Sequence, residues 1–126
     1  MKKFLAVYVG TPEHMARWNE LTPTVQAERQ ASGIRAWHKW VEDNKARIVD
    51  NGGPLGKTKS VASTGVTDIH NAMTGYTVLL AETHEEAAKL FADHPHFTIF
   101  PGDAVEIMEC LPIPANSEAS QETPPK

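Results

Sequence analysis

The most constraining feature of this sequence is a set of short segments that are apolar at nearly every position. Residues 3–9 are rich in β-branched and aromatic side chains and end at Gly10-Thr11-Pro12, which predicts a strand followed by a turn. Segments 76–82 and 104–111 are predicted strands of the same kind, with apolar side chains on both faces. The three segments therefore predict a sheet that is covered on both sides.

Helical patterns separate these strands. Residues 34–45 carry apolar side chains at three- and four-residue spacing, which predicts a helix with one apolar stripe, and Gly33 predicts a break or bend before it. Thr11-Pro12 and Thr22-Pro23 each place a capping hydroxyl before a proline that suits a first helical turn. Residues 85–91 begin with two glutamates and continue to Lys89, which matches the helix dipole of a second main helix.

The remaining segments complete the predicted order. Residues 47–50 predict a short strand, 51–56 an irregular turn, 59–64 a further extended piece, 65–75 a loop and 94–102 a second loop. The order is β-α-β-β-α-β, which predicts an α+β, ferredoxin-like fold with an extra hairpin. Two helices cover only one face of such a sheet. A second copy of the chain is the simplest cover for the other face, so we predict a homodimer.

Length and composition narrow the class of protein. The chain has 126 residues, which fits one domain, and we place that domain at 1–114. Residues 115–126 are rich in Ser, Glu and Pro and predict a disordered tail. The net charge is -4 with no dense basic segment, which argues against nucleic acid as a partner. The single cysteine, Cys110, lies in an apolar run and predicts a buried thiol rather than a disulfide or a zinc site.

The N-terminus imitates an export signal only weakly. Its apolar run is short, has no small-x-small cleavage site and stops at Gly10-Thr11-Pro12. The sequence has no apolar segment approaching the roughly 20 residues that a membrane helix needs. These observations predict a cytoplasmic protein that does not associate with membranes.

Residues 51–58 come close to a phosphate-binding loop without completing it. The segment ends in Gly56-Lys57-Thr58 and follows a predicted strand, but Asn51 replaces the first glycine and Pro54 removes an amide that phosphate needs. No helix is predicted after it. We therefore interpret the segment as a turn with a solvated Lys57, whose ammonium group is also a candidate partner for a carboxylate ligand.

Two further polar positions are candidates for ligand binding. His94 and His96 are two residues apart, so an extended segment would place both imidazoles on one side, but zinc needs three or four ligands and no spacing fixes a third. We predict no metal site and favour a capped loop at His94. Glu109 shares a strand face with Val105, Ile107 and Leu111, where it is either a catalytic acid inside the barrel or a residue at the sheet edge; we favour the edge.

From Gly33 to Pro114 the sequence resembles the YCII-related family, particularly its longer, DGPF-type members. The shared features are Ala36-Trp37 with Trp40, the segment Val49-Asp50-x-Gly-x-Pro54-Leu55-Gly56, Gly75-Tyr76, the Glu85–Ala88 helix, His94-Pro95, and the stretch from Val105-Glu106 to Pro114. The resemblance implies a dimeric α+β barrel. It also implies lyase-like chemistry for some members, since one known activity of the family is dehydrochlorination of an aromatic compound.

Small members of that family are thought to pair a helix histidine with an aspartate. The resemblance places this histidine near Ala36 or His38 and the aspartate near Asp50; at Ala36 the pair would be absent. We therefore take His38 and Asp50 as acid–base candidates, because imidazole suits proton transfer at neutral pH and a carboxylate can orient it. Trp37 and Trp40 are either core residues or the aromatic walls of a ligand site.

The hypothesis from the sequence is a cofactor-independent enzyme or binder for a small organic acid or aromatic compound. His38 and Asp50 are its catalytic candidates, and Trp37, Trp40, Lys57, His94 and Glu109 are its ligand-binding candidates. No dinucleotide fingerprint or metal set is present in the sequence, so we predict no cofactor. The alternative is a non-catalytic dimeric module that senses a ligand or regulates a partner.

Overall fold

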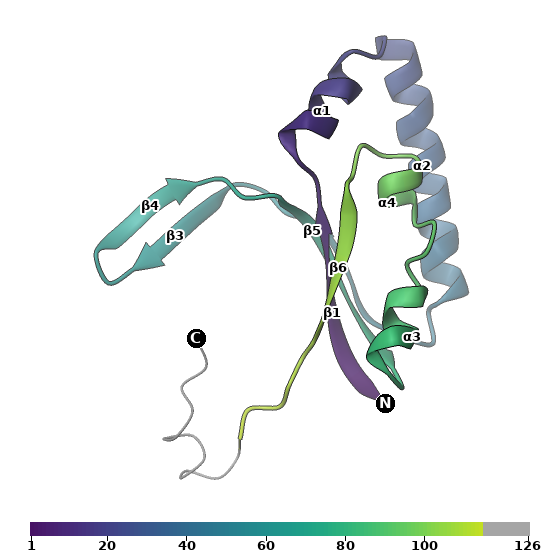
Figure 1. The fold of residues 1–126 in the computed structure, drawn as a ribbon. Coiled ribbons are helices and arrows are strands. Elements are labelled where there is room, and N and C mark those ends of the chain that lie inside the picture. Colours follow the sequence, from purple (N-terminus) through teal and green to yellow (C-terminus); the bar gives the residue numbers. More distant parts are fainter. Residues whose placement is uncertain (115–126) are drawn as a thin grey trace.

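The structure, a computed structural model, describes residues 1–114; the predicted disordered tail lies outside this part. In the described chain two helices follow the first strand, four strands come next, and two short helices precede the last strand (Figure 1). None of the described helices is both long and apolar enough to cross a membrane. The elements are β1 (Lys2–Val9), α1 (Pro12–Asn19), α2 (Pro23–Asp43), β2 (Ile48–Pro54), β3 (Thr58–Ala62), β4 (Gly65–Ile69), β5 (Met73–Ala81), α3 (His84–Lys89), α4 (Pro95–Thr98) and β6 (Ala104–Glu109).

The main sheet has four strands in the order β2-β5-β1-β6, and every neighbouring pair is antiparallel. When the β3-β4 hairpin is set aside, this is the strand order of a ferredoxin-like fold, with the last strand beside the first. The hairpin forms a separate two-stranded sheet inserted between β2 and β5. The predicted α+β class with an antiparallel sheet and an extra hairpin is confirmed, whereas the pairing of two chains stays a prediction.

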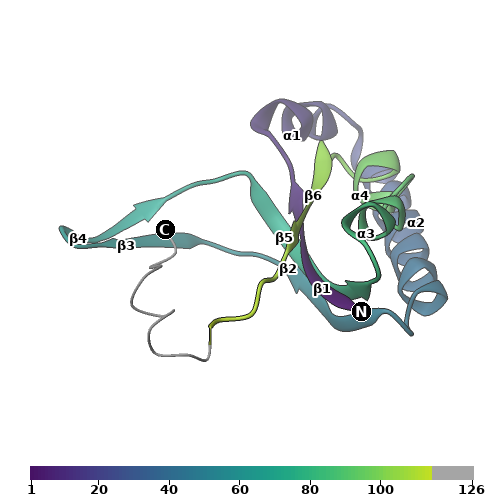
Figure 2. The same cartoon turned by 60° about the horizontal axis from the view of Figure 1, so that its bottom comes forward.

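One face of the sheet holds the core. Phe4 on β1 is fully buried opposite Leu79 on β5, and Ala6 lies opposite Thr77 in the same register. Helices α2, α3 and α4 cover this face, as Figure 2 shows. Phe91, which follows α3, closes the core from the helix side. The alternation of side chains along β1 and β5 thus puts the largest apolar groups beneath the helices.

The opposite face has no helix over it. Leu5 and Val7 on β1 lie opposite Val78 and Tyr76 on β5, and these four side chains alternate with the core residues. The β3-β4 hairpin projects on the side of the sheet away from the helices (Figure 2). We call this surface the open face and use the name for the side of the sheet that carries Leu5, Val7, Tyr76, Val78 and Leu80.

Two sequence predictions about chain breaks are wrong. Helix α2 continues through Gly33 without a break. Gly33 is buried against the Phe100 ring, and a Cβ atom at this position would lie only 2.3 Å from that ring. Glycine therefore serves close packing here and not a bend. Residues 65–75 are not a loop, since 65–69 form β4 and Met73 begins β5. Cross-strand pairing from Thr58–Ala62 to Gly65–Ile69 outweighs the turn-forming composition of that segment.

Three smaller predictions also need correction. The segment 51–56 is not all turn: β2 continues to Pro54, and as an edge strand it tolerates a proline. The segment 94–102 contains helix α4, with His94 as its N-cap. Cys110 is exposed and not buried, because it lies just beyond β6, where no neighbouring helix covers the chain.

Candidate functional site

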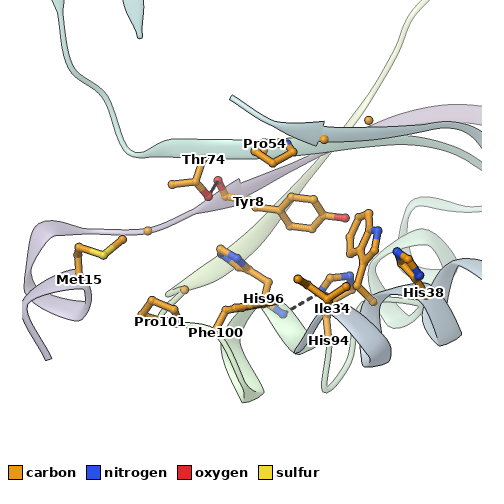
Figure 3. A pocket seen from close by; sticks show the side chains of 16 residues that line it. Tyr8, Met15, Ile34, His38, Pro54, Thr74, His94, His96, Phe100 and Pro101 are labelled. Carbon is orange, nitrogen blue, oxygen red and sulfur yellow. Dashed lines mark hydrogen bonds between the residues drawn. The ribbon is translucent and has the colours of Figure 1, made fainter. Parts of the chain in front are cut away.

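A cavity of about 530 Å³ lies between helix α2 and the sheet. Figure 3 shows Tyr8, Pro54 and Thr74 on the sheet side, Ile34 and His38 on the helix side, and Met15 of α1 at one end. The volume falls in the range of small-molecule sites. The lining residues come from α1, α2, α4, three strands and two loops: Tyr8, Gly10, Met15, Ile34, Trp37, His38, Gly52, Gly53, Pro54, Thr74, Gly75, His94, His96, Phe100, Pro101 and Gly102.

Glycines form much of the sheet side of this cavity. Gly52 has φ of +67°, and a Cβ atom there would lie 1.7 Å from the Tyr76 carbonyl oxygen, so no other residue fits without moving the backbone. At Gly75 a Cβ atom would lie 3.0 Å from both the Tyr8 ring and the Gly53 carbonyl oxygen. Glycine at these two positions thus lets β2, β5 and the Tyr8 ring approach one another closely on the sheet side of the cavity.

Tyr8 lies at the centre of the cavity wall and is almost fully buried. Its hydroxyl and the Thr77 Oγ1 are 2.6 Å apart, and Thr77 in turn donates to the Asn51 carbonyl at 3.1 Å. Because the Thr77 proton is used in that second bond, the Tyr8 hydroxyl is the donor in the first. Burial raises the pKa of Tyr8, and the hydrogen bond with Thr77 offsets part of this rise, so the phenol stays protonated.

His94 is the most buried titratable side chain of the site, with 1% of its surface exposed. The backbone N–H of His96 donates to its Nδ1 at 3.0 Å, which caps α4 and places the proton of the neutral ring on Nε2. Rings of Tyr8, Trp37, Trp40 and Phe91 surround it. Burial first, and the neighbouring His96 second, lower the pKa of His94 to about 4, so the ring is neutral at pH 7.

His96 lines the cavity beside Tyr8 and is also tied to the backbone. Its Nε2 lies 2.8 Å from the Val9 carbonyl oxygen. Burial lowers the pKa of His96, although the carbonyls of Val9 and Ala104 act in the opposite direction. Gly102 makes this position possible, since a Cβ atom there would lie 2.2 Å from the imidazole.

His38 differs from these two histidines because it is exposed. It lies on α2 at the edge of the cavity, and within residues 1–114 its ring has no hydrogen-bond partner. Trp37, one residue earlier, lines the cavity and is half-buried. Trp40 is not a lining residue: its Nε1 donates to the Leu90 carbonyl at 2.8 Å, and its ring stacks on Phe91. Of the two tryptophans, only Trp37 can therefore contact a ligand directly.

The structure does not bring Asp50 to His38. The Asp50 carboxylate accepts from the Gly52 N–H at 2.9 Å and from the Tyr76 hydroxyl at 3.3 Å. Tyr76 lies on the open face, because its neighbours Gly75 and Thr77 face the cavity side of β5. Asp50 thus lies on the open face of the sheet, whereas His38 lies on the face that the helices cover.

Lys57 and Glu109 also lie away from the cavity. Lys57 is exposed between β2 and β3, and Glu109 is exposed on β6, at the edge of the sheet. Neither residue lines the cavity. Of the ligand-binding candidates from the sequence, Trp37 and His94 are at the cavity, and the structure keeps Trp40, Lys57 and Glu109 outside it.

Sequence reasoning missed several residues of the site. Tyr8 and Phe100 form its walls, and the only signal in the sequence is that Tyr8 shares a strand face with Phe4 and Ala6. A histidine–aspartate pair is also present, but at different positions from the predicted one: His14 on α1 contacts Asp103, which precedes β6. Among the described residues, no cluster of three or more His, Cys, Asp and Glu side chains is placed to hold a metal ion.

The fold and the cavity together define an α+β protein with an apolar site between one helix layer and an antiparallel sheet. No family model and no curated protein matches the sequence. A similar solved structure is the 5-chloro-2-hydroxyhydroquinone dehydrochlorinase TftG from Burkholderia phenoliruptrix AC1100, in complex with 2,5-dihydroxybenzoquinone. The TM-score is 0.50 at 18% identity, over 84% of this chain and 90% of the other. This likeness shows a shared fold.

Proposed function

We propose that this protein is a small-molecule enzyme of the YCII-related type that carries out cofactor-independent acid–base chemistry in the cavity beneath α2. The observation that carries the proposal is the position of His38, whose ring has no partner in the described chain and borders a cavity of about 530 Å³. The shared fold with a dehydrochlorinase supports the same class of reaction. Imidazole is the side chain most often used for proton transfer at neutral pH.

In this proposal His38 acts as the general base. Its free ring nitrogen takes a proton from a carbon of the ligand, and the electron pair of that C–H bond forms a double bond as a leaving group departs with its own bonding pair. The proton then passes to water, which reaches His38 because the residue is exposed. Asp50 has no part in this step within one chain, since it lies on the open face with Tyr76.

Deuterium exchange tests the proposal for any compound that has an acidic C–H bond. The full chain is incubated in deuterated water with a panel of small ketones, phenols and chlorinated hydroquinones, and NMR follows loss of carbon-bound protons while an electrode follows chloride. We expect exchange or elimination with at least one compound, and its loss in His38→Gln. The matched control is His70→Gln, an exposed histidine that does not line the cavity. Exchange that survives His38→Gln would remove His38 from the mechanism.

The second candidate function is a ligand-sensing module without catalysis. The observation that favours it is that His94 and His96 already serve as an N-cap and as a partner of the Val9 carbonyl, while Asp50 is separated from His38. Binding of a panel compound in the cavity with no exchange and no elimination would support this function over the first.

We further propose that a second copy of the chain covers the open face. Leu5, Tyr76, Val78 and Leu80 are only half-buried there, and Met108 on β6 is 43% exposed. Burial of such side chains gives roughly 25 cal/mol per Å² of apolar surface, which makes a covered face more stable than a solvated one. A twofold axis would place the same surface on both sides of the contact.

Light scattering after size-exclusion chromatography tests this pairing. We expect a dimer for the wild-type chain and a monomer for Val78→Asp, because the new carboxylate would be buried without a partner. Val61→Asp is the matched control, since Val61 is 78% exposed on the β3-β4 hairpin. A wild-type monomer at high concentration would exclude the dimer.

A further inference from the structure

The elimination assigned to His38 sets a condition on its ligand. Imidazole is a weak base, and a C–H bond without an electron-withdrawing neighbour is too weak an acid to give it a proton. A carbonyl group on the adjacent carbon removes this difficulty, because the electron pair that the proton leaves behind moves onto the carbonyl oxygen. The site then needs a hydrogen-bond donor that faces this oxygen as its negative charge develops.

The donors that the cavity offers are neutral groups. Of the residues that the structure describes, the sixteen that line the cavity include no Lys or Arg (Figure 3). Burial lowers the pKa values of His94 and His96, so neither ring supplies a positive charge at neutral pH. The donor to a ligand oxygen is therefore an uncharged N–H or O–H group of the lining.

The hydroxyl and imidazole groups on the sheet side are already engaged within the protein. The Tyr8 hydroxyl donates to Thr77, and Thr74 donates to the Tyr8 carbonyl at 3.1 Å. The His96 Nε2 lies 2.8 Å from the Val9 carbonyl oxygen. Each of these groups would have to give up an internal hydrogen bond to serve a ligand, which cancels most of the gain.

Several other N–H groups of the lining are also engaged or covered. The backbone N–H groups of Gly10, Gly52 and Gly102 donate to acceptors of the chain, each at 2.9 Å. The Nε2 of His94 has no partner in the described part of the chain, but it is shielded from solvent, and only 1% of the residue is exposed. A ligand oxygen does not reach that atom in this conformation.

The indole N–H of Trp37 differs from these groups. It has no hydrogen-bond partner within residues 1–114, and it is not shielded from solvent. In Trp40, which follows on the same helix, the corresponding Nε1 donates to the Leu90 carbonyl at 2.8 Å. Trp37 also directly precedes His38, and both residues line the cavity. Helix α2 thus supplies a free base and a free donor at neighbouring positions.

Ring contacts hold the Trp37 indole in place. It stacks on Trp40 with ring centroids 5.8 Å apart and 25° between the planes. Tyr8 and His94 pack edge-on against it, with centroids at 5.6 Å and 5.4 Å. These contacts fix the N–H group before a ligand binds. A donor that is already oriented stabilises developing charge well, because it does not have to reorganise during the reaction.

We propose that Trp37 is a catalytic residue whose indole N–H donates to a carbonyl oxygen of the ligand, and that this ligand is a ketone with the reactive C–H bond beside the carbonyl and the leaving group one carbon further. The inference rests on the proposed function and deepens it, because it names the substrate class of the same site. It also gives Trp37 a chemical role in addition to its contact with the ligand.

The step balances with the residues already described. His38 takes the proton, and the electron pair of the C–H bond forms a double bond to the carbonyl carbon while the π pair of the carbonyl moves onto the oxygen that faces Trp37. When this pair returns, the new carbon–carbon π pair shifts toward the next carbon, and the leaving group departs with its bonding pair. The product is an unsaturated ketone, and the proton passes from His38 to water.

Chloride release from two matched probes tests the substrate class. The probes are β-chloropropiophenone, which has the required carbonyl, and phenylpropyl chloride, which has the same skeleton without it. The full chain carries Cys110→Ser, because the exposed thiol of Cys110 would add to the unsaturated ketone. We expect release above the buffer rate from the ketone and none from phenylpropyl chloride.

Three replacements test the role of the indole N–H. Trp37→Phe keeps an aromatic ring and removes the donor, so kcat should fall about 100-fold while KM changes by less than about threefold. Benzothienylalanine at position 37 has sulfur in place of the N–H group in a ring of the same shape, and it should lower kcat to the same extent. The matched control is Trp18→Phe, which removes a half-buried indole that does not line the cavity and should leave kcat unchanged.

The outcomes separate the inference from the proposed function. Release from the ketone that is lost in His38→Gln and lowered by both replacements of Trp37 supports both. Release that requires His38 but is unchanged with benzothienylalanine, or equal release from phenylpropyl chloride, overturns the inference and leaves the proposed function. Release that survives His38→Gln overturns both. Absence of release above the buffer rate overturns the inference and counts against elimination in this cavity.

Discussion

The two faces of the main sheet are made by the same strands and yet have opposite properties. Beneath the helices, Phe4 and Leu79 are fully buried, and the site histidine His94 is packed among aromatic rings. On the open face, Leu5 and Leu80 occupy the alternate positions and are only half-buried. The face beneath the helices is therefore well buried within a single chain, whereas on the open face Val7 is buried and its apolar neighbours remain half-exposed.

The two faces show what a sequence pattern can and cannot predict about a sheet. Alternation along a strand shows that both faces are apolar, but it does not show which partner covers each face. Helices of the same chain cover the first face, where the cavity also lies. The cover of the open face is a separate proposal, so the dimer and the cavity are tested by different experiments.

The largest expected effect comes from adjacent leucines on the two faces. Leu79→Ala should lower the free energy of unfolding by about 2–5 kcal/mol, because it removes a fully buried side chain from the core. Leu80→Ala, one residue later on the open face, should cost clearly less in a monomer. Urea unfolding at low protein concentration measures both. Equal losses would show that the open face is covered within a single chain.

Acid should weaken the helix-covered face through His94. The pKa of His94 is about 4 in the folded state, below its ordinary 6.5, so the unfolded chain binds a proton first as the pH falls. Stability is unaffected above about pH 6.5 and is lost progressively between pH 6.5 and pH 4, by about 3 kcal/mol at most. Urea unfolding across this range measures the slope. His94→Asn keeps a good N-cap and should flatten that slope.

A smaller effect is expected where α2 meets the cavity wall. Gly33→Ala should destabilise the protein by a net amount of about 1 kcal/mol, because displacement of the Phe100 ring outweighs the helix propensity gained from alanine. Thermal unfolding measures this change, and Phe100→Ala in the same chain should relieve it. Gly53→Ala is the control, since its Cβ atom meets nothing within 4 Å. Stabilisation by Gly33→Ala would show that the Phe100 ring moves away easily.

The smallest effect is expected on the hairpin beyond the open face. Lys59 and Asp68 form an exposed ion pair across β3 and β4. Lys59→Met should change the free energy of unfolding by less than about 1 kcal/mol, because surface pairs contribute little in water. Chemical denaturation at low and high salt checks this. A loss well above about 1 kcal/mol at both salt concentrations would contradict this prediction.

Much of the fold follows from local patterns, whereas the site depends on contacts between distant segments. Thr22 caps α2 as its sequence predicts, by accepting from the Val25 N–H, and Thr83 caps α3 in the same way. The predicted bend at Gly33 is wrong because the position requires glycine for its contact with Phe100, far along the chain. No local pattern contains that contact.

The candidate acid–base pair is separated for a similar reason. His38 borders the cavity, but β2 has two register irregularities around Asp50, and simple alternation does not say which face such a residue occupies. The pair that the structure does form, His14 with Asp103, joins α1 to the start of β6 and leaves no spacing signal in the sequence. Local chemistry thus predicts the residue types of the site better than their partners.

The irregularities of β2 also bear on how this protein avoids aggregation. β2 is an edge of the main sheet, and an unbroken edge strand is a template for strand addition by other chains. Here the register shifts between Ile48 and Asp50 and again between Asp50 and Gly53, and the strand ends at a proline that offers no N–H group. Growth of the sheet at this edge is thereby discouraged, so the β2 edge is protected by its own backbone geometry and not by a covering element.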